Sequence, residues 1–132
     1  MERSAGLARR VIDEIWNGGD LALADALFAP TYVNHGGLIP DLARGPEAIK
    51  VSVAGFRAAF PAFRHAVVDV LVQPPTIALH WRAVADDRPG AAAGSLSGMT
   101  FARLRHDQIV ESWTCWERRP GDDRAGRHGV GG

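Results

Sequence analysis

Two neighbouring polar residues, Asn34 and His35, have the side chains best suited to acid/base chemistry in this chain. Histidine titrates near neutral pH and can both accept and donate a proton. An asparagine amide can donate and accept hydrogen bonds, so Asn34 can hold a substrate carbonyl or a water molecule. The pair predicts a catalytic site in which His35 moves the proton. The alternatives are a histidine hydrogen-bonded at a strand end and an asparagine engaged in local turn bonding.

The local backbone limits how these two side chains can act together. Residues 32–35 are typical of a short strand, and a loop containing Gly36, Gly37 and Pro40 follows. Adjacent residues of a strand point to opposite faces, so Asn34 and His35 face one pocket only if the backbone is irregular there.

A second histidine, His80, lies in the middle of a predicted strand at residues 76–85. Alternation puts Leu79 and Trp81 on one face of this strand and His80 on the other. We expect one face to line a pocket and the other to lie on the outer side. The sequence leaves open which face is which, and His80 is kept as a candidate for substrate binding.

The order of the remaining elements indicates how a pocket is built. The sequence predicts helices at 4–17, 21–28 and 46–60, and strands at 32–35, 64–72, 76–85 and on both sides of a turn at 105–108 within the segment 94–117. Consecutive strands with short connections pair antiparallel, and helices gathered before them pack on one face of the sheet. We therefore expect an α+β fold, a cone-shaped barrel in which a curved antiparallel sheet packs on three N-terminal helices and leaves a pocket at its open end.

Length and composition exclude several classes of protein. The chain has 132 residues and a formal net charge of zero, which predicts one domain without an electrostatic footprint for nucleic acid or a charged membrane. Its single cysteine, Cys115, excludes an intrachain disulfide and a cysteine-rich metal site. The histidines are too scattered for a helix-borne ligand pair, so we expect no metal and no cofactor.

The ends of the chain carry few signals. The N-terminus lacks the apolar core of a signal peptide, and no apolar run approaches the ~20 residues of a membrane span, so we expect a cytoplasmic protein without membrane contact. The segment 119–132 is rich in Gly, Asp and Arg, which predicts a flexible tail after a domain at 1–118.

Several stretches of the chain resemble the SnoaL-like polyketide cyclases of the nuclear-transport-factor-2-like superfamily. They are IDEIWNGGDLALADALFAPTYVNH, GPEAI followed by FRAAFPAF, and GMTFARLRHDQIVESW. The resemblance extends over nearly the whole chain up to about Glu117. The superfamily contains cyclases, isomerases, dehydratases, epoxide hydrolases and non-enzymatic binding proteins, so the resemblance implies the fold more specifically than the reaction.

The resemblance also implies positions for site residues. Aldol-type ester cyclases of the family use an aspartate on the last strand, and the matching position here is Thr114, in SWTCW. A polar partner on the preceding strand is matched by Thr100, and a family pocket asparagine is matched by Asn34. The usual carboxylate is therefore replaced by a hydroxyl, and proton transfer is expected on the opposite side of the pocket, at Asn34 and His35.

Two functional hypotheses follow. The first is a cofactor-independent acid/base enzyme of secondary metabolism, of the cyclase, isomerase or dehydratase type, that acts on an apolar polyketide-like molecule. The second is a non-catalytic small-molecule-binding or dimeric interaction module of the same fold. In either case we expect a homodimer formed through the outer face of the sheet. The residues predicted to bind the ligand are Trp16, Phe56, Phe60, His80, Met99, Thr100 and Trp116.

Overall fold

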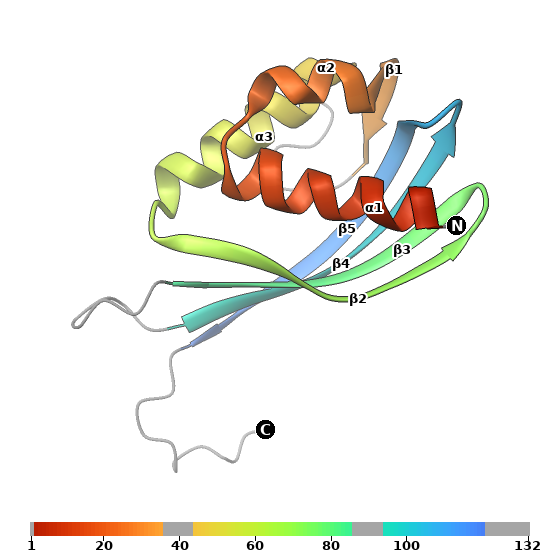
Figure 1. Ribbon diagram of the computed structural model, residues 1–132. Helices are drawn as coiled ribbons and strands as arrows, with labels where there is room; N and C mark the ends of the chain where they lie inside the picture. Colours follow the sequence, from red (N-terminus) through yellow and green to blue (C-terminus); the bar gives the residue numbers. More distant parts are fainter. Residues whose placement is uncertain (1, 36–43, 86–93, 121–132) are drawn as a thin grey trace.

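The computed structural model describes residues 2–35, 44–85 and 94–120. Helices lie on one side of a curved sheet, and the described C-terminal strand continues to Pro120, into the segment predicted as a tail (Figure 1). The rest of that segment, 121–132, lies outside the described residues, as does most of the loop 86–94.

The N-terminal helix begins as α1 (Glu2–Arg10) and continues as a π-helical segment, η1 (Val11–Asn17). Its end matches the prediction, because Gly19 adopts a φ of 73°, a conformation that favours glycine. The Arg57 side chain donates hydrogen bonds to the carbonyl oxygens of Trp16 and Asn17, at 3.0 and 2.7 Å. These bonds satisfy carbonyls that a helix end leaves without intrahelical partners.

The second helical segment is shorter than predicted. It consists of a 3₁₀ turn, η2 (Leu21–Leu23), and α2 (Ala24–Leu27). The Asp20 carboxylate caps its start by accepting a hydrogen bond from the Leu23 backbone at 3.2 Å. The chain then becomes extended at Phe28, earlier than predicted, and forms β1 (Phe28–Asn34). The third helix, α3 (Pro46–Ala59), begins with proline at its first position, as expected.

Four long strands follow and form most of the sheet. They are β2 (Phe63–Gln73), β3 (Thr76–Ala85), β4 (Gly94–Arg105) and β5 (Gln108–Pro120). The order is β1-β5-β4-β3-β2; β1 pairs parallel with β5, and the other pairs are antiparallel. The predicted α+β fold, with a curved sheet packed on three N-terminal helices, is confirmed. The described strands do not close into a complete barrel, since β1 and β2 are the two edges.

The predicted hairpin between β4 and β5 is confirmed, with a turn of two residues. His106 and Asp107 have φ values of 54° and 64°. Positive φ at both central residues is the property of a type I′ turn, whose twist matches that of the flanking strands. The turn places Leu104 opposite Ile109, and a bulge between Arg103 and Leu104 then shifts the pairing by one residue. The turn and the bulge together bring Thr100 opposite Thr114.

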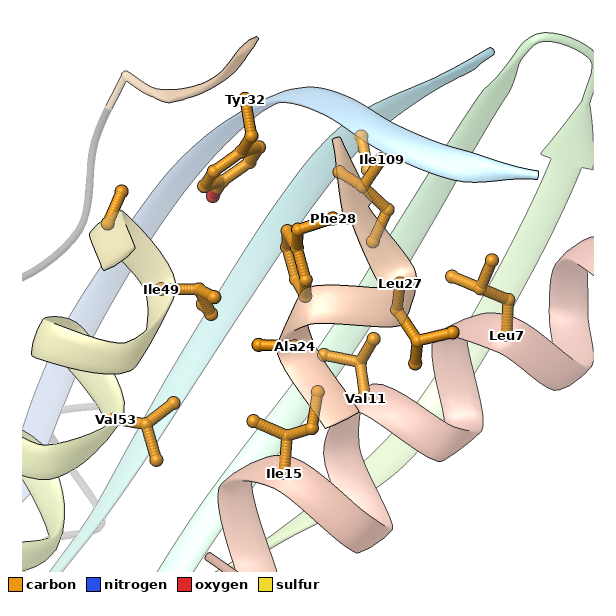
Figure 2. Close-up of a cluster of buried hydrophobic side chains, with 12 residues drawn as sticks. Leu7, Val11, Ile15, Ala24, Leu27, Phe28, Tyr32, Ile49, Val53 and Ile109 are labelled. Atoms are coloured by element: carbon orange, nitrogen blue, oxygen red, sulfur yellow. The ribbon is translucent and has the colours of Figure 1, made fainter. Parts of the chain in front are cut away.

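The apolar core consists of two clusters between the helices and the sheet. The first contains Leu7, Val11 and Ile15 of the N-terminal helix together with Leu27, Phe28 and Ile109 (Figure 2). In this cluster the rings of Phe28 and Tyr32 are 4.8 Å apart between centroids. The second contains Ile12, Phe56, Leu79, Trp81, Ala83 and Leu96.

Candidate functional site

A cavity of about 120 Å³ lies among the helices and the strands of the sheet, and all five strands contribute to its wall. Most of the wall is apolar. Its polar side chains, apart from the tryptophans, are Tyr32, Asn34, Ser52, His65, Thr100, Ser112 and Thr114. No Asp, Glu, Lys or Arg is among the described residues that line it.

The cavity shows which face of the sheet is the inner one. Leu79 and Trp81 of β3 line the cavity and are both 8% exposed. By alternation His80 points to the outer side, where its Nε2 lies 3.4 Å from the Ser97 hydroxyl. The sequence left open which face of β3 lines the pocket, and the structure shows that it is the face of Leu79 and Trp81.

Six of the residues predicted for the site line the cavity: Trp16, Asn34, Phe56, Thr100, Thr114 and Trp116. The other four do not: His35, Phe60, His80 and Met99. Phe60 instead packs against Phe56 and Phe63, with ring centroids 5.0 and 5.1 Å apart. Met99 is 52% exposed and lies on the outer face.

His35 was predicted to move the proton, but its ring lies away from the cavity. The ring stacks on Trp113 with a centroid distance of 4.8 Å, and its Nε2 is 3.0 Å from the Glu111 carboxylate. Trp113 alternates with the cavity-lining residues Ser112 and Thr114 and so belongs to the outer face. Asn34 is 7% exposed and lines the cavity, so these two neighbours face opposite sides, as regular strand geometry requires.

A chain of hydrogen bonds crosses the floor of the cavity from β3 to β5. The Trp81 indole N–H donates to the Thr100 hydroxyl at 3.1 Å, and the hydroxyls of Thr100 and Thr114 are 2.9 Å apart. Gly98 makes room for this indole, because a Cβ atom there would lie 2.1 Å from Cζ2 of Trp81. The two positions matched by resemblance, Thr100 and Thr114, are therefore bonded to each other.

A second pair of hydroxyls joins β1 to β5. The Tyr32 hydroxyl and the Ser112 hydroxyl are 2.6 Å apart, and both residues are buried. Burial raises the pKa of Tyr32 to about 12, against a smaller opposite effect of the hydrogen bond from Ser112. Tyr32 is therefore a neutral phenol near pH 7.

His65, at the start of β2, is the histidine that lines the cavity. Its ring centroid lies 4.8 to 5.2 Å from the rings of Phe56, Trp16 and Trp81. Burial among these rings lowers the pKa of His65 to about 4, because the charged form loses its hydration. The imidazole is therefore neutral near pH 7.

The residues of this wall with hydrogen-bonding side chains that sequence reasoning missed are Tyr32, Ser52, His65, Trp81 and Ser112. Ser112 shares the face of Thr114 by alternation, and Ser52 lies one helical turn before Phe56, so spacing contained a signal for these two. For His65 and Trp81 the signal was ambiguous, because β2 and β3 carry apolar residues on both faces. A register shift in β2 between Val67 and Asp69 further obscures the alternation of that strand.

In the described part of the chain a curved sheet is covered by helices, and an uncharged cavity lies between them. The family model for the SnoaL-like domain matches residues 8–112. The chain therefore belongs to the SnoaL-like family of the nuclear-transport-factor-2-like superfamily, and the predicted resemblance is confirmed. No curated protein matches the chain in sequence.

Solved structures support the same fold. IdmH from Streptomyces antibioticus, a candidate polyketide cyclase, superposes with a TM-score of 0.72 at 23% identity, over 86% of this chain and 91% of that chain. A candidate polyketide cyclase from Bacillus cereus superposes with a TM-score of 0.75 at 16% identity, over 87% of this chain and 74% of that chain. A candidate isomerase of the SnoaL-like family from Agrobacterium tumefaciens superposes with a TM-score of 0.68 at 16% identity, over 89% of this chain and 99% of that chain. At these identities the likeness shows the fold alone.

Proposed function

We propose that this protein is a cofactor-independent acid/base enzyme that cyclises, isomerises or dehydrates an uncharged, carbonyl-bearing small molecule of the polyketide type. The observation that carries the proposal is the pairing of hydroxyls in a cavity without charged side chains. Polar groups buried in such a place are costly unless they bond to something, and a ligand oxygen meets that need.

Counting hydroxyl protons shows what the wall offers a ligand. The indole of Trp81 only donates, so it occupies a lone pair of Thr100. Thr100 and Thr114 share one of their two protons, and whichever way that bond runs, one proton remains to be donated elsewhere. The same count holds for Tyr32 and Ser112. Each pair can therefore donate to an oxygen that becomes negative during the reaction, as oxyanion-binding groups do.

The roles of the cavity residues follow from these bonds. Thr114 and Asn34 hold polarised oxygens of the substrate, as the resemblance suggested. Trp16, Phe56 and Trp116 shape the apolar part of the pocket. His35 has no place in this scheme, because its ring lies on the outer face beside Trp113.

The substrate is expected to be uncharged where it enters the cavity. An ion buried without a partner costs far more free energy than a neutral group, and no Asp, Glu, Lys or Arg is among the described residues that line the cavity. An apolar cavity of about 150 Å³ holds a benzene molecule. The present cavity, at about 120 Å³, is somewhat smaller but of the same order, and we expect it to take one ring or a short ketone segment of a larger molecule.

The proposal is tested with a probe ketone, because enolisation is the shared first step of such reactions. Cyclohexanone is incubated with the protein in D₂O, and loss of the α-proton signals is followed by NMR. We expect exchange above the buffer rate, reduced about 100-fold in the double variant Thr100→Val with Thr114→Val, which removes the free proton of the pair; a loss of this size is typical of one oxyanion donor. Thr31→Val, an exposed threonine of β1, is the control and should retain the wild-type rate.

Two outcomes would contradict the proposal. Exchange at the buffer rate, with cyclohexanone shown to bind by tryptophan fluorescence, would favour the alternative of a non-catalytic binding module. Equal exchange in wild type and in the double variant Thr100→Val with Thr114→Val would show that the hydroxyl pair plays no part.

We also propose that two copies of the chain pair through the outer face of the sheet. Large apolar side chains are exposed there, among them Met99 and Phe101 at 52% and 53%. Phe101 lies directly opposite Trp113 in the β4–β5 register, so these two rings form part of one apolar surface.

A further inference from the structure

We propose that His65 is the residue that transfers the proton in this cavity. The inference rests on the proposed function and assigns its central step to a residue on β2, on the side of the cavity away from β1. Among the described lining residues, His65 and Tyr32 are the two with titratable side chains. Tyr32 would have to be ionised to accept a proton, and its burial disfavours that form.

The state of the imidazole suits a base. Because its burial keeps the ring neutral near pH 7, one nitrogen has a free lone pair without prior loss of a proton. His65 is 7% exposed and makes ring contacts with Trp16, Phe56 and Trp81. Among the described residues no ion pair involves His65, so desolvation alone sets the state of its ring before a ligand binds.

The same aromatic rings support the protonated state once it forms. The imidazole is tilted or edge-on to these rings, at interplanar angles of 43°, 61° and 46°, and a cation within about 6 Å of an aromatic centroid gains a cation–π attraction where it lies over the ring face. An enolate formed in the cavity would add an ion pair across a medium that screens charge weakly. The cavity therefore disfavours protonation of the His65 ring when the cavity holds no anion. It favours the protonated ring once an enolate has formed beside it.

The position of His65 is fixed by its backbone, which leaves the ring available to a ligand. The Asn17 side chain bonds both backbone groups of His65: its amide donates to the carbonyl at 2.9 Å, and its oxygen accepts from the N–H at 2.7 Å. Arg57 in turn bonds the carbonyl of Asn17 at 2.7 Å. The end of η1 thus holds the start of β2 at two points, and groups held in this way lose little entropy when they react.

The step is a proton transfer between carbon and nitrogen. A nitrogen lone pair of His65 takes the α-proton of the ketone, and the electrons of that C–H bond become the C=C bond of an enolate. The carbonyl π electrons move onto oxygen, where the free proton of the Thr100–Thr114 pair is donated as a hydrogen bond. The imidazolium then returns its proton to carbon or to the leaving oxygen, so that the enzyme ends unchanged.

The first test measures the proton on His65 directly and needs no turnover. The ¹⁵N-labelled protein at pH 7 is titrated with 4-nitrophenol, whose phenolate resembles an enolate in charge and shape. We expect both ring nitrogens of His65 to move to protonated shifts as the yellow phenolate binds. Binding with a neutral His65 ring, or no binding, would overturn the inference.

The second test uses cyclohexanone exchange in D₂O with His65→Gln. We expect the exchange kcat to fall at least about 100-fold, the lower range for general-base catalysis. Affinity for the ketone should change less than about tenfold, the value of one neutral hydrogen bond. The control is His106→Asn in the exposed β4–β5 turn, which should exchange like wild type.

The two tests separate this inference from the proposed function. If wild type and His65→Gln exchange equally fast, the acid/base function stands and His65 is not the base. If wild type does not exchange and His65 stays neutral with nitrophenol, both are overturned. If His65 had only a structural role, His65→Gln would lower the stability of the protein. It would not lower the exchange kcat while the affinity for the ketone is retained.

Discussion

Burial of the His65 imidazole makes the stability of this protein sensitive to acid. The pKa of His65 is about 4 in the folded chain and about 6.5 in an unfolded one, so between these values the unfolded state binds more protons. The contribution is complete above pH 6.5 and is lost as the pH falls towards 4. One pKa unit corresponds to about 1.36 kcal/mol, so the difference between the folded and unfolded pKa values contributes about 3 kcal/mol to stability.

The measurement is urea unfolding at several pH values between 4 and 7.5. The free energy of unfolding of wild type should fall by about this amount across the range, and His65→Gln should show a correspondingly weaker dependence on pH. Parallel curves for the two proteins would show that His65 is not buried as a neutral ring.

Gly98 determines where the Trp81 indole lies, and alanine at this position should displace it. The added Cβ atom would meet Cζ2 of Trp81 at 2.1 Å, and the ring cannot move without losing its hydrogen bond to Thr100. We expect Gly98→Ala to lower the free energy of unfolding by about 1–3 kcal/mol, as overpacking does. Thermal unfolding and tryptophan fluorescence measure the two effects.

The matched control is Gly6→Ala in α1. A Cβ atom there meets nothing within 4 Å, so this change should stabilise the protein by about 0.5–1 kcal/mol through helix propensity. Equal effects of the two substitutions would contradict the close approach of Trp81 to β4.

At the scale of elements, the β4–β5 hairpin is joined by a turn whose residues are not the ones its geometry prefers. His106 and Asp107 both have positive φ, where non-glycine residues are strained. The double variant His106→Asn with Asp107→Gly introduces the pair most common in type I′ turns. We expect it to raise the free energy of unfolding by about 1 kcal/mol, measured by chemical denaturation.

The control must separate turn geometry from the loss of charge. Asp107 forms an exposed ion pair with Arg3 at 2.9 Å, and Arg3→Ala removes that pair without altering the turn. Its effect should be small, since exposed pairs contribute about 0–1 kcal/mol. A loss of stability in the double variant larger than that in Arg3→Ala would contradict a type I′ turn.

At the scale of the whole molecule, the exposed apolar surface on the outer face predicts self-association. A charge placed at its centre by Phe101→Arg would have to be buried at the interface without a partner, so we expect this variant to be monomeric at concentrations where wild type is dimeric. Sedimentation velocity measures the masses. Val51→Arg, on an exposed position of α3, should leave the assembly unchanged. A monomeric wild type at micromolar concentration would refute the proposed pairing.

The described part of the chain contains no helix long and apolar enough to cross a membrane.

Local signals were enough to predict most of the elements. Glycines 18 and 19 end the first helix, Asp20 caps the next segment, and Pro46 begins α3, because these conformations depend on a few neighbouring residues. The turn at 106–107 was predicted for the same reason. The extent of β1 was not, since it begins at Phe28 through parallel pairing with β5, a partner far away in sequence.

The sequence by itself determined the α+β class and the antiparallel hairpin, because periodicity and turn chemistry are local properties. Six residues of the cavity wall were also predicted, and among them Thr100 and Thr114 rested on the family resemblance. Only the tertiary structure decided which face of each strand is the inner one. Alternation states that Trp81 and His80 point in opposite directions, but the helices decide which of them is covered. For the same reason Asn34 faces the cavity and His35 does not, and the chain packs His65 of β2 among aromatic rings from α3, η1 and β3.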